Sequence, residues 1–228
     1  MAGTTPGTDD LTLDELRVAL APAIADAAVF DGWSDAALEM AADQMDADRD
    51  VARLAFKPGF GGSRAMEMIS AWIEAIDMAM AAAMPPEELA KLKIRDRIRM
   101  LVQYRLDAVA GQEEALRRAL AIMAMPQNAP RAIRLGWNSA DVMWRLAGDT
   151  ATDYNHYTKR AILASIYAAT LAVYLEDESE GKADTRAFLD RRIDGVMRFE
   201  KTKARLLGSE RETFSVTRFL GRLRYPAR

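Results

Sequence analysis

The sequence predicts an all-α fold of about ten helices. Ala, Leu, Met, Arg and Glu are frequent, whereas only 13 Gly and 8 Pro occur among 228 residues, and this composition favours helix. Apolar residues recur three and four positions apart, which is the period of an amphipathic helix. No segment alternates between apolar and polar residues as a half-buried strand does. Hydrophobic residues make up 50% of the chain, so a substantial packed core is expected.

Caps and chain breaks place the helices along the chain. Residues 1–10 are expected to form a disordered leader. Thr12 and Glu15 have the spacing of a capping box, which predicts a helix start. Segments rich in Gly, Pro or polar residues separate the later helices, and Gly208 with Ser209 predicts a hinge before the last one. The predicted helices cover about residues 12–27, 34–44, a short helix ending near 56, then 63–83, 87–110, 112–124, 131–146, 151–176, 183–207 and 213–224.

Short helices come first and longer ones follow. This order resembles the TetR-type regulator architecture, in which a small helix-turn-helix end is joined to a larger helical ligand domain. We therefore expect four parts: a leader at 1–10, a degenerate helix-turn-helix-like unit at 11–62, a larger helical ligand domain at 63–207 and an amphipathic basic helix at 208–228. The resemblance at this level is one of topology, and topology alone does not imply a function.

Composition excludes several classes of site. The chain has no cysteine and one histidine, His156, which excludes thiol chemistry and any site that needs two imidazoles. We expect no enzyme, no cofactor and no metal site, although Asp149, Asp153 and His156 could be brought together geometrically. No stretch approaches the roughly 20 apolar residues that span a bilayer, and residues 1–10 resemble neither a signal nor a transit peptide.

Charge is distributed unevenly along the chain. Residues 1–90 contain 5 basic and 17 acidic side chains, whereas residues 204–228 contain 6 basic and 2 acidic ones. The acidic beginning should repel nucleic acid, and the basic end should be attracted to an anionic membrane surface. In the helix-turn-helix candidate at 34–56, Arg49 and Arg53 are outnumbered by acidic residues, among them Asp43, Asp46, Asp48 and Asp50. Since a DNA reader needs Lys or Arg on its second helix, we expect no nucleic-acid partner.

Four motifs between residues 119 and 200 have a distinctive order. The first is Pro-Gln-Asn-Ala-Pro at 126–130, and the second is Trp-Arg-Leu-Ala-Gly-Asp at 144–149. The third is Thr-Asp-Tyr-Asn-His-Tyr-Thr-Lys-Arg-Ala at 152–161, and the fourth is Phe-Leu-Asp-Arg-Arg at 188–192. Together they resemble the pattern of the COQ-nine (COQ9) family, whose members are lipid-binding accessory proteins of ubiquinone biosynthesis with a TetR-like fold. The resemblance covers about residues 12–205.

The resemblance implies a function and partners. A member of this family extracts or presents an isoprenoid lipid or quinone precursor at the membrane to the di-iron demethoxyubiquinone hydroxylase. The sequence departs from the family at Tyr154, where Phe is usual, and at His156, where many relatives have Trp in a partner-binding patch. The alternative prediction is a TetR-type transcriptional regulator with a hydrophobic effector. We expect a cytoplasmic protein, peripheral on the inner face of a bacterial membrane, or its organellar matrix equivalent in a eukaryote. A homodimer is left open.

Three sets of residues are predicted to form sites. Thr150 and Asp153 have the spacing of a capping box, so the helix that follows should have a rigid first turn. The first turns of this helix combine aromatic, imidazole and guanidinium groups, which are typical of interface hot spots. The predicted partner-binding residues are Asp153, Asn155, His156, Tyr157 and Arg160. The predicted lipid-binding residues, which an ordinary core would also explain, are Met123, Met125, Trp137, Met143, Trp144, Leu163, Ile166, Tyr167 and Tyr174.

The last predicted helix has an apolar stripe flanked by arginines. Four apolar residues are spaced i, i+3, i+4 and i+7, as expected of an amphipathic helix that lies in a membrane interface. The predicted membrane-binding residues are Phe214, Val216, Arg218, Phe219, Leu220, Arg222 and Leu223. A final helix that docks on the core would explain the same pattern, with its arginines in solvent.

Overall fold

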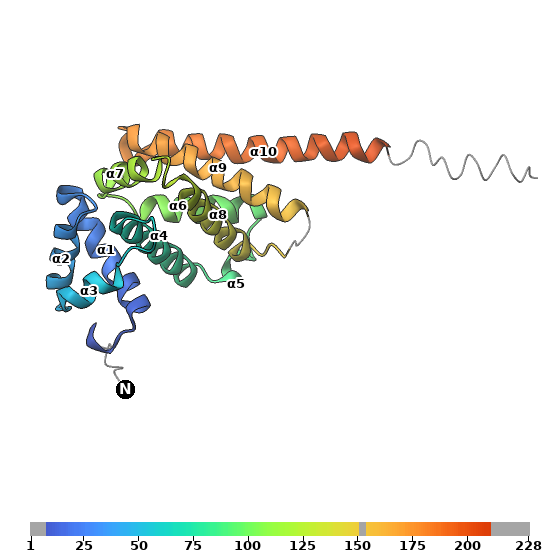
Figure 1. Ribbon diagram of the computed structural model, residues 1–228. Coiled ribbons are helices and arrows are strands. Elements are labelled where there is room, and N and C mark those ends of the chain that lie inside the picture. The colour runs from blue at the N-terminus through green and yellow to red at the C-terminus, as the bar shows by residue number, and fades with distance from the viewer. Residues whose placement is uncertain (1–7, 151–153, 211–228) are drawn as a thin grey trace, which may run out of the picture.

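The computed structural model describes residues 8–150 and 154–210, and in this part of the chain every regular element is helical (Figure 1). The predicted all-α class is confirmed. The elements are η1 (Thr8–Asp10), α1 (Leu13–Asp31), α2 (Asp35–Gln44), α3 (Arg49–Ala55), α4 (Arg64–Ala83), α5 (Pro86–Leu89), α6 (Ile94–Asp107), α7 (Glu113–Met123), α8 (Ala129–Leu146), α9 (Tyr154–Glu176), η2 (Glu180–Lys182) and α10 (Ala183–Glu210).

Side-chain caps start the early helices. Thr12 and Glu15 form the predicted capping box of α1: the Glu15 N–H donates to Thr12 Oγ1 at 3.3 Å, and the Thr12 N–H donates to Glu15 Oε2 at 2.9 Å. Ser34 and Ser63 cap α2 and α4 in the predicted way. These caps satisfy N–H groups that have no partner within the helix, which is why short local signals located these helix starts correctly.

Three predicted boundaries differ from the structure. The expected single helix at 87–110 is divided into α5 and α6, because the chain turns at residues 90–93. The expected hinge at Gly208 is wrong, since α10 continues through it to Glu210; a single Gly weakens a helix by only about 1 kcal/mol and does not oblige it to end. Part of the expected disordered leader, Thr8–Asp10, is a 3-10 turn.

The first three helices form a unit at one end of the molecule, and α4 to α9 form the larger bundle beside it (Figure 1). Both parts share one core. The indole of Trp33, which follows α1, packs on Trp72 of α4 with ring centroids 5.3 Å apart, and its Nε1–H donates to the Ala115 carbonyl of α7 at 2.9 Å. A buried tryptophan that satisfies its polar atom in this way joins the two parts firmly.

An ion-pair cluster adds a second connection between these parts. The carboxylate of Glu67 in α4 is nearly buried, and it accepts hydrogen bonds from Arg17 of α1 at 3.1 Å and from both Nη atoms of Arg131 in α8, at 2.6 and 2.7 Å. Hydrogen bonds from Arg131 hold the pKa of Glu67 below its ordinary value, although burial acts in the opposite direction. Glu67 therefore ties the first helix to two helices of the bundle.

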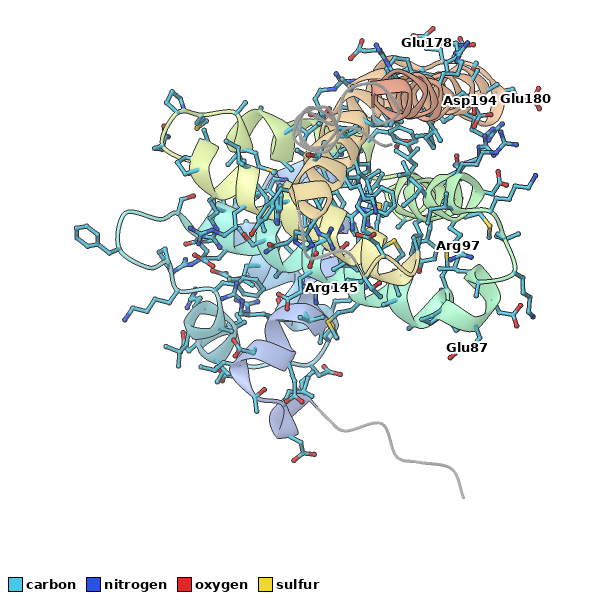
Figure 2. All side chains as sticks on the ribbon, turned by 90° about the vertical axis from the view of Figure 1, so that its right-hand side faces the viewer. Glu87, Arg97, Arg145, Glu178, Glu180 and Asp194 are labelled. Atoms are coloured by element: carbon cyan, nitrogen blue, oxygen red, sulfur yellow. The ribbon has the colours of Figure 1, made fainter. Side chains whose placement is uncertain are left out.

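The helix α10 lies across α9 and contacts α6, and its C-terminal part extends beyond the other helices (Figure 1). Figure 2 shows α10 at the edge of the bundle, with Asp194 on it above the helix that carries Arg97. Within the described ranges 8–150 and 154–210, no helix combines the length and the apolar character needed to cross a bilayer.

Candidate functional site

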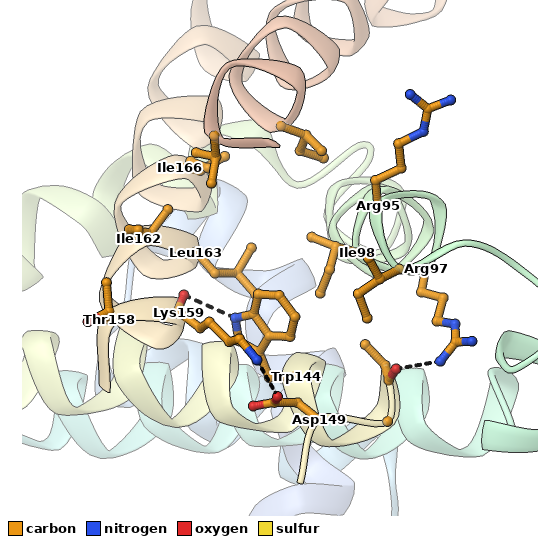
Figure 3. Close-up of a pocket in the computed structure, with 15 residues that line it drawn as sticks. Arg95, Arg97, Ile98, Trp144, Asp149, Thr158, Lys159, Ile162, Leu163 and Ile166 are labelled. Carbon is orange, nitrogen blue, oxygen red and sulfur yellow. Dashed lines mark hydrogen bonds and ion pairs between the residues drawn. The ribbon is translucent and has the colours of Figure 1, made fainter. Parts of the chain in front are cut away.

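A cavity of about 380 Å³ opens between α6, the α8–α9 turn, α9 and α10 (Figure 3). We refer to it as the pocket. Its lining is mainly apolar, with a small number of polar groups near the α8–α9 turn. The lining residues are Ile94, Arg95, Arg97, Ile98, Trp144, Ala147, Gly148, Asp149, Thr158, Lys159, Ile162, Leu163, Ile166, Ile193 and Val196.

Three helices each present an apolar pair to the pocket. Residues one turn apart on a helix lie on one face, and the pairs are Ile94 with Ile98 on α6, Ile162 with Ile166 on α9, and Ile193 with Val196 on α10. Leu163, a buried residue of α9, adds to this apolar lining. An apolar lining with few polar groups is typical of sites that bind small hydrophobic molecules.

Trp144 and Lys159 form the polar end of the pocket. The Trp144 Nε1–H donates to the Lys159 carbonyl at 3.0 Å, and the Lys159 ammonium lies 5.4 Å from the centre of the Trp144 ring. The same ammonium donates to Asp149 Oδ1 at 2.6 Å (Figure 3). Burial tends to raise the pKa of Asp149, but hydrogen bonds from Lys159 and Arg160 hold it below its ordinary value, so this carboxylate is ionised.

Arg97 closes the α6 side of the pocket by binding backbone carbonyls. Its Nη1 donates to the Ala147 carbonyl at 2.7 Å, its Nε to Leu92 at 2.9 Å, and its Nη2 to Ala90 at 3.0 Å. These bonds connect the α5–α6 turn to the end of α8 (Figure 3). All three nitrogens of the guanidinium group therefore have structural partners, and Arg97 serves to shape the pocket.

Arg160 lies in a different environment from the one expected. A partner-binding residue, as predicted for Arg160, needs an accessible side chain, but the side chain of Arg160 is only 2% exposed. Its Nε donates to Asp141 Oδ1 at 2.5 Å, and its Nη1 donates to Asp149 Oδ2 at 3.2 Å and to the His156 carbonyl at 3.1 Å. The prediction of an exposed Arg160 is wrong because two aspartates on the α8 side of the site, at a distance in sequence, draw the cation inward.

The other predicted partner-binding residues differ in their exposure, and one of them is outside the described part of the chain. Tyr157 is 62% exposed, and its ring centre lies 6.0 Å from that of Trp137 in α8 and 5.1 Å from that of His156. We call Trp137, His156 and Tyr157 the aromatic patch. Asn155 is in the first turn of α9, whereas Asp153 lies outside the described residues. On α9 the patch residues His156 and Tyr157 directly precede the pocket residues Thr158 and Lys159 in sequence.

The predicted lipid-binding residues only partly coincide with the pocket. Trp144, Leu163 and Ile166 line it. Met143, Tyr167 and Tyr174 are buried elsewhere in the core, Met123 is partly buried, Met125 is exposed and Trp137 belongs to the aromatic patch. Prediction missed the contributions of α6 and α10, namely Ile94, Ile98, Ile193 and Val196. Their apolar spacing was visible in the sequence, but only tertiary packing brings them to α9.

The predicted membrane-binding residues, from Phe214 to Leu223, all lie outside the described residues. Asp149, one of the three residues that could have formed a metal site, is instead paired with Lys159 and Arg160. Among residues 8–150 and 154–210, no group of three or more His, Asp and Glu side chains is arranged to hold a metal ion.

The fold belongs to a class of helical proteins with a TetR-like architecture. The crystal structure of the TetR transcriptional regulator from Nitrosomonas europaea ATCC 19718 is similar to this chain, with a TM-score of 0.60 over 78% of this chain and 96% of that one. The sequences are 23% identical, so this likeness concerns the fold alone.

The second comparison concerns sequence. Residues 129–200, which comprise α8, α9 and part of α10, match the family model COQ9. The chain is 36% identical over 127 residues to the ubiquinone biosynthesis protein COQ9, mitochondrial, of Rattus norvegicus, and 34% identical over 127 residues to that of Homo sapiens. These matches cover 56% of this chain and 38% and 37% of the relatives, so the chain spans little more than a third of their length. The resemblance to the COQ9 family is confirmed.

Proposed function

We propose that this protein is a non-catalytic accessory protein of ubiquinone biosynthesis that binds an isoprenoid quinone precursor and presents it at a membrane to a hydroxylase. The observation that supports this most directly is the apolar pocket between α6, α9 and α10. Its α8, α9 and α10 walls lie within the residues that match the COQ9 family, and the rat and human relatives are named for ubiquinone biosynthesis.

The size of the pocket limits what it can hold. Small-molecule sites generally have volumes of about 300–1,000 Å³, so a cavity of about 380 Å³ accommodates a head group or part of an isoprenoid chain. Each buried CH₂ group contributes about 0.8 kcal/mol. An apolar cavity therefore offsets much of the cost of moving a section of such a lipid away from the bilayer, which is the physical requirement for an extracting or presenting protein.

The aromatic patch is the proposed contact for the partner enzyme. Tyrosine and tryptophan provide a large contact area at low entropic cost, and Tyr157 is the exposed member of the patch. By resemblance to the COQ9 family, the partner is the di-iron demethoxyubiquinone hydroxylase. Tyr157 and the pocket residue Lys159 are two positions apart on α9, so the proposed contact and the polar end of the pocket lie at the same end of this helix.

The proposed place of action follows from the same reasoning. The rat and human relatives are named as mitochondrial proteins. For this chain we propose peripheral attachment to the inner face of a bacterial membrane, or to the equivalent matrix face in an organelle. The basic residues at 204–228 supply the attraction to anionic lipid.

Mass spectrometry of bound lipid tests the proposed function. Natively purified protein and a delipidated sample of the same preparation are extracted with organic solvent, and the extracts are compared. We expect an isoprenoid lipid or quinone precursor in the native extract only. Indistinguishable extracts, together with no uptake of a short-chain ubiquinone by the delipidated protein, would contradict the proposal.

The alternative function is a TetR-type regulator, and the shared fold is the observation that favours it. The α2–α3 unit argues against it. Arg53 donates to Glu39 at 2.7 Å and to Asp50 at 2.8 Å, and Arg49 donates to Asp43 at 2.6 Å. Both arginines of α3 are thus neutralised within the chain, whereas phosphate binding needs available cations. A mobility-shift titration on genomic DNA fragments at low salt tests this alternative, and we expect no shift.

A further inference from the structure

Most polar side chains of the pocket are hydrogen-bond donors, whereas Asp149 is an acceptor and the Thr158 hydroxyl can act as either. Lys159 and Arg95 contribute an ammonium and a guanidinium group, and neither group can accept a hydrogen bond. Arg95 forms only long ion pairs, 3.5 Å to Asp96 and 3.8 Å to Asp194. Its side chain and that of Lys159 remain 47% and 39% exposed, respectively. Both cations therefore remain in contact with solvent; the Arg95 guanidinium points away from the other lining residues, whereas the Lys159 ammonium lies beside Trp144 and Asp149 (Figure 3).

The one carboxylate in the lining is already used. Asp149 is 6% exposed, its Oδ1 accepts from Lys159, and its Oδ2 accepts from Arg160 at 3.2 Å. The face of Trp144, which could otherwise attract a cation, has the Lys159 ammonium 5.4 Å from its ring centre. A positively charged head group would find neither an available anion nor an unoccupied aromatic face at this end of the pocket.

We propose that the pocket selects amphiphiles whose head group is a hydrogen-bond-accepting oxygen, such as a carbonyl, carboxylate or phosphate, and that Lys159 is the residue that binds it. This inference rests on the proposed function and specifies its ligand class. An ammonium group has three N–H donors, so Lys159 can keep its bond to Asp149 while donating another to a ligand oxygen. The apolar part of the ligand lies along Ile98, Leu163 and Ile166.

The positive charges of Lys159 and Arg95 both favour a head group with an oxygen acceptor. A charge-assisted hydrogen bond is stronger than a neutral one, and it is screened less within a partly enclosed apolar cavity than in water. Arg95, at the opposite side of the pocket from Lys159 (Figure 3), adds positive potential. Asp96 and Asp194 lie 3.5 and 3.8 Å from Arg95 and reduce the potential that it adds, although Asp96 pairs more closely with Arg99, at 2.7 Å.

Three ligands with the same tail and different heads test the inference. Decanoate and decyltrimethylammonium, each below its micellar concentration, and decanol, below its solubility limit, are titrated calorimetrically into delipidated full-length protein. We expect decanoate and decanol to bind, and decyltrimethylammonium to bind at least about tenfold more weakly, which corresponds to the loss of one good polar contact. Equal binding of all three would overturn the head-group selection while leaving lipid binding intact.

Variants assign the selection to Lys159. Lys159→Met keeps most of the length of the side chain and removes the charge, so decanoate should bind about tenfold more weakly and the cationic ligand more tightly. Lys159→Arg should keep the preference of the wild type. Lys91→Met is the matched control, because Lys91 forms a similar 2.6 Å ion pair with Glu88 but does not line the pocket. An unchanged order of affinities in Lys159→Met, with circular dichroism confirming the fold, would overturn the role of Lys159. Failure of every ligand to bind would contradict both this inference and the proposed function.

Discussion

Arg160 and Tyr157 are three positions apart in sequence and have opposite environments. Arg160 is 2% exposed and holds Asp141, Asp149 and the His156 carbonyl, whereas Tyr157 is 62% exposed. Removing one partner of a buried ion pair leaves an uncompensated charge in the interior, and this is far more costly than the loss of an exposed pair. The two residues should therefore respond to substitution in different experiments.

Replacing Arg160 should affect stability. In Arg160→Glu, three carboxylates would lie close together beside the pocket, so we expect a loss of about 3–5 kcal/mol or more in the free energy of unfolding. Urea denaturation followed by circular dichroism measures it. The control is Arg145→Glu, which also removes a partner of Asp141 but from a side chain that is 73% exposed, and for which we expect about 1 kcal/mol or less. Equal losses in the two variants would show that burial of Arg160 has no energetic consequence.

Replacing Tyr157 should affect binding to the partner. If the aromatic patch contacts the hydroxylase, Tyr157→Ala should weaken that complex by about thirtyfold, the effect of losing a hot spot worth about 2 kcal/mol, while lipid loading stays the same. Calorimetric titration with the purified enzyme measures the affinity. Phe60→Ala is a suitable control, since Phe60 is a fully exposed aromatic residue in the α3–α4 loop, outside the patch. Unchanged affinity in Tyr157→Ala would remove the patch from the interface.

At the scale of the elements, one carboxylate at the α9–α10 turn binds the start of α10. Asp177 Oδ1 accepts from the Ser179 N–H and hydroxyl at 2.8 and 2.5 Å, and its Oδ2 accepts from the Thr185 N–H and hydroxyl at 2.8 and 2.6 Å. Bonds from the Ser179 and Thr185 hydroxyls, with those from the backbone, hold the pKa of Asp177 well below its ordinary value. This carboxylate fixes the start of α10, which supplies Ile193 and Val196 to the pocket.

Asp177→Asn should lower the thermal midpoint in a pH-dependent manner. The depressed pKa of the folded state stabilises the protein above the unfolded-state pKa of about 4, and this contribution is lost as the pH falls through the folded-state pKa. The difference in midpoint between wild type and variant should thus be largest near neutral pH and should shrink below about pH 4. Thermal melts at several pH values measure it. Asp184→Asn removes the same charge from the first turn of α10 and serves as the control. A difference that grows on acidification would contradict the role assigned to Asp177.

The whole molecule has an uneven charge distribution. The three helices at one end lie within the acidic residues 1–90, and α10 extends away from them (Figure 1). In the sequence, basic residues outnumber acidic ones at 204–228. Such an arrangement would orient the protein on an anionic surface, because the basic end is attracted and the acidic end is repelled.

Deleting residues 211–228 should weaken membrane binding and leave the fold intact. The deletion starts after Glu210, the last residue of α10, because the structure shows no break at Gly208. It removes Arg211, Arg218, Arg222, Arg224 and Arg228, each worth about 1 kcal/mol near an anionic surface. Flotation with vesicles of phosphatidylcholine and phosphatidylserine, at low and high salt, measures binding. Equal flotation of both forms would contradict a membrane role, and a large fall in thermal midpoint would indicate that this segment docks on the core.

Local sequence signals predicted the all-α class and most helix starts. Motifs within α8 to α10 were sufficient to recognise the family resemblance. The capping box at Thr12 and the Ser34 and Ser63 caps are formed by residues close together in sequence, so hydrogen-bonding chemistry and apolar periodicity were sufficient to identify them. The breaks at residues 90–93 and the continuity of α10 through Gly208 were not predicted, because a helix end there depends on what the neighbouring helices stabilise rather than on local propensity.

The pocket and the environments of its residues were decided by tertiary structure. Ile98, Leu163 and Ile193 are distant in sequence, and only the packing of α6, α9 and α10 brings them to one cavity. The sequence alone was sufficient to predict Trp144 and Leu163 as lipid-binding residues and to place Asp149 in a turn before the helix that carries Arg160. Whether Arg160 faces solvent or the interior depended on the positions of Asp141 and Asp149 in space. A buried charge is stable only beside its counter-charges, and those positions are a property of the complete fold.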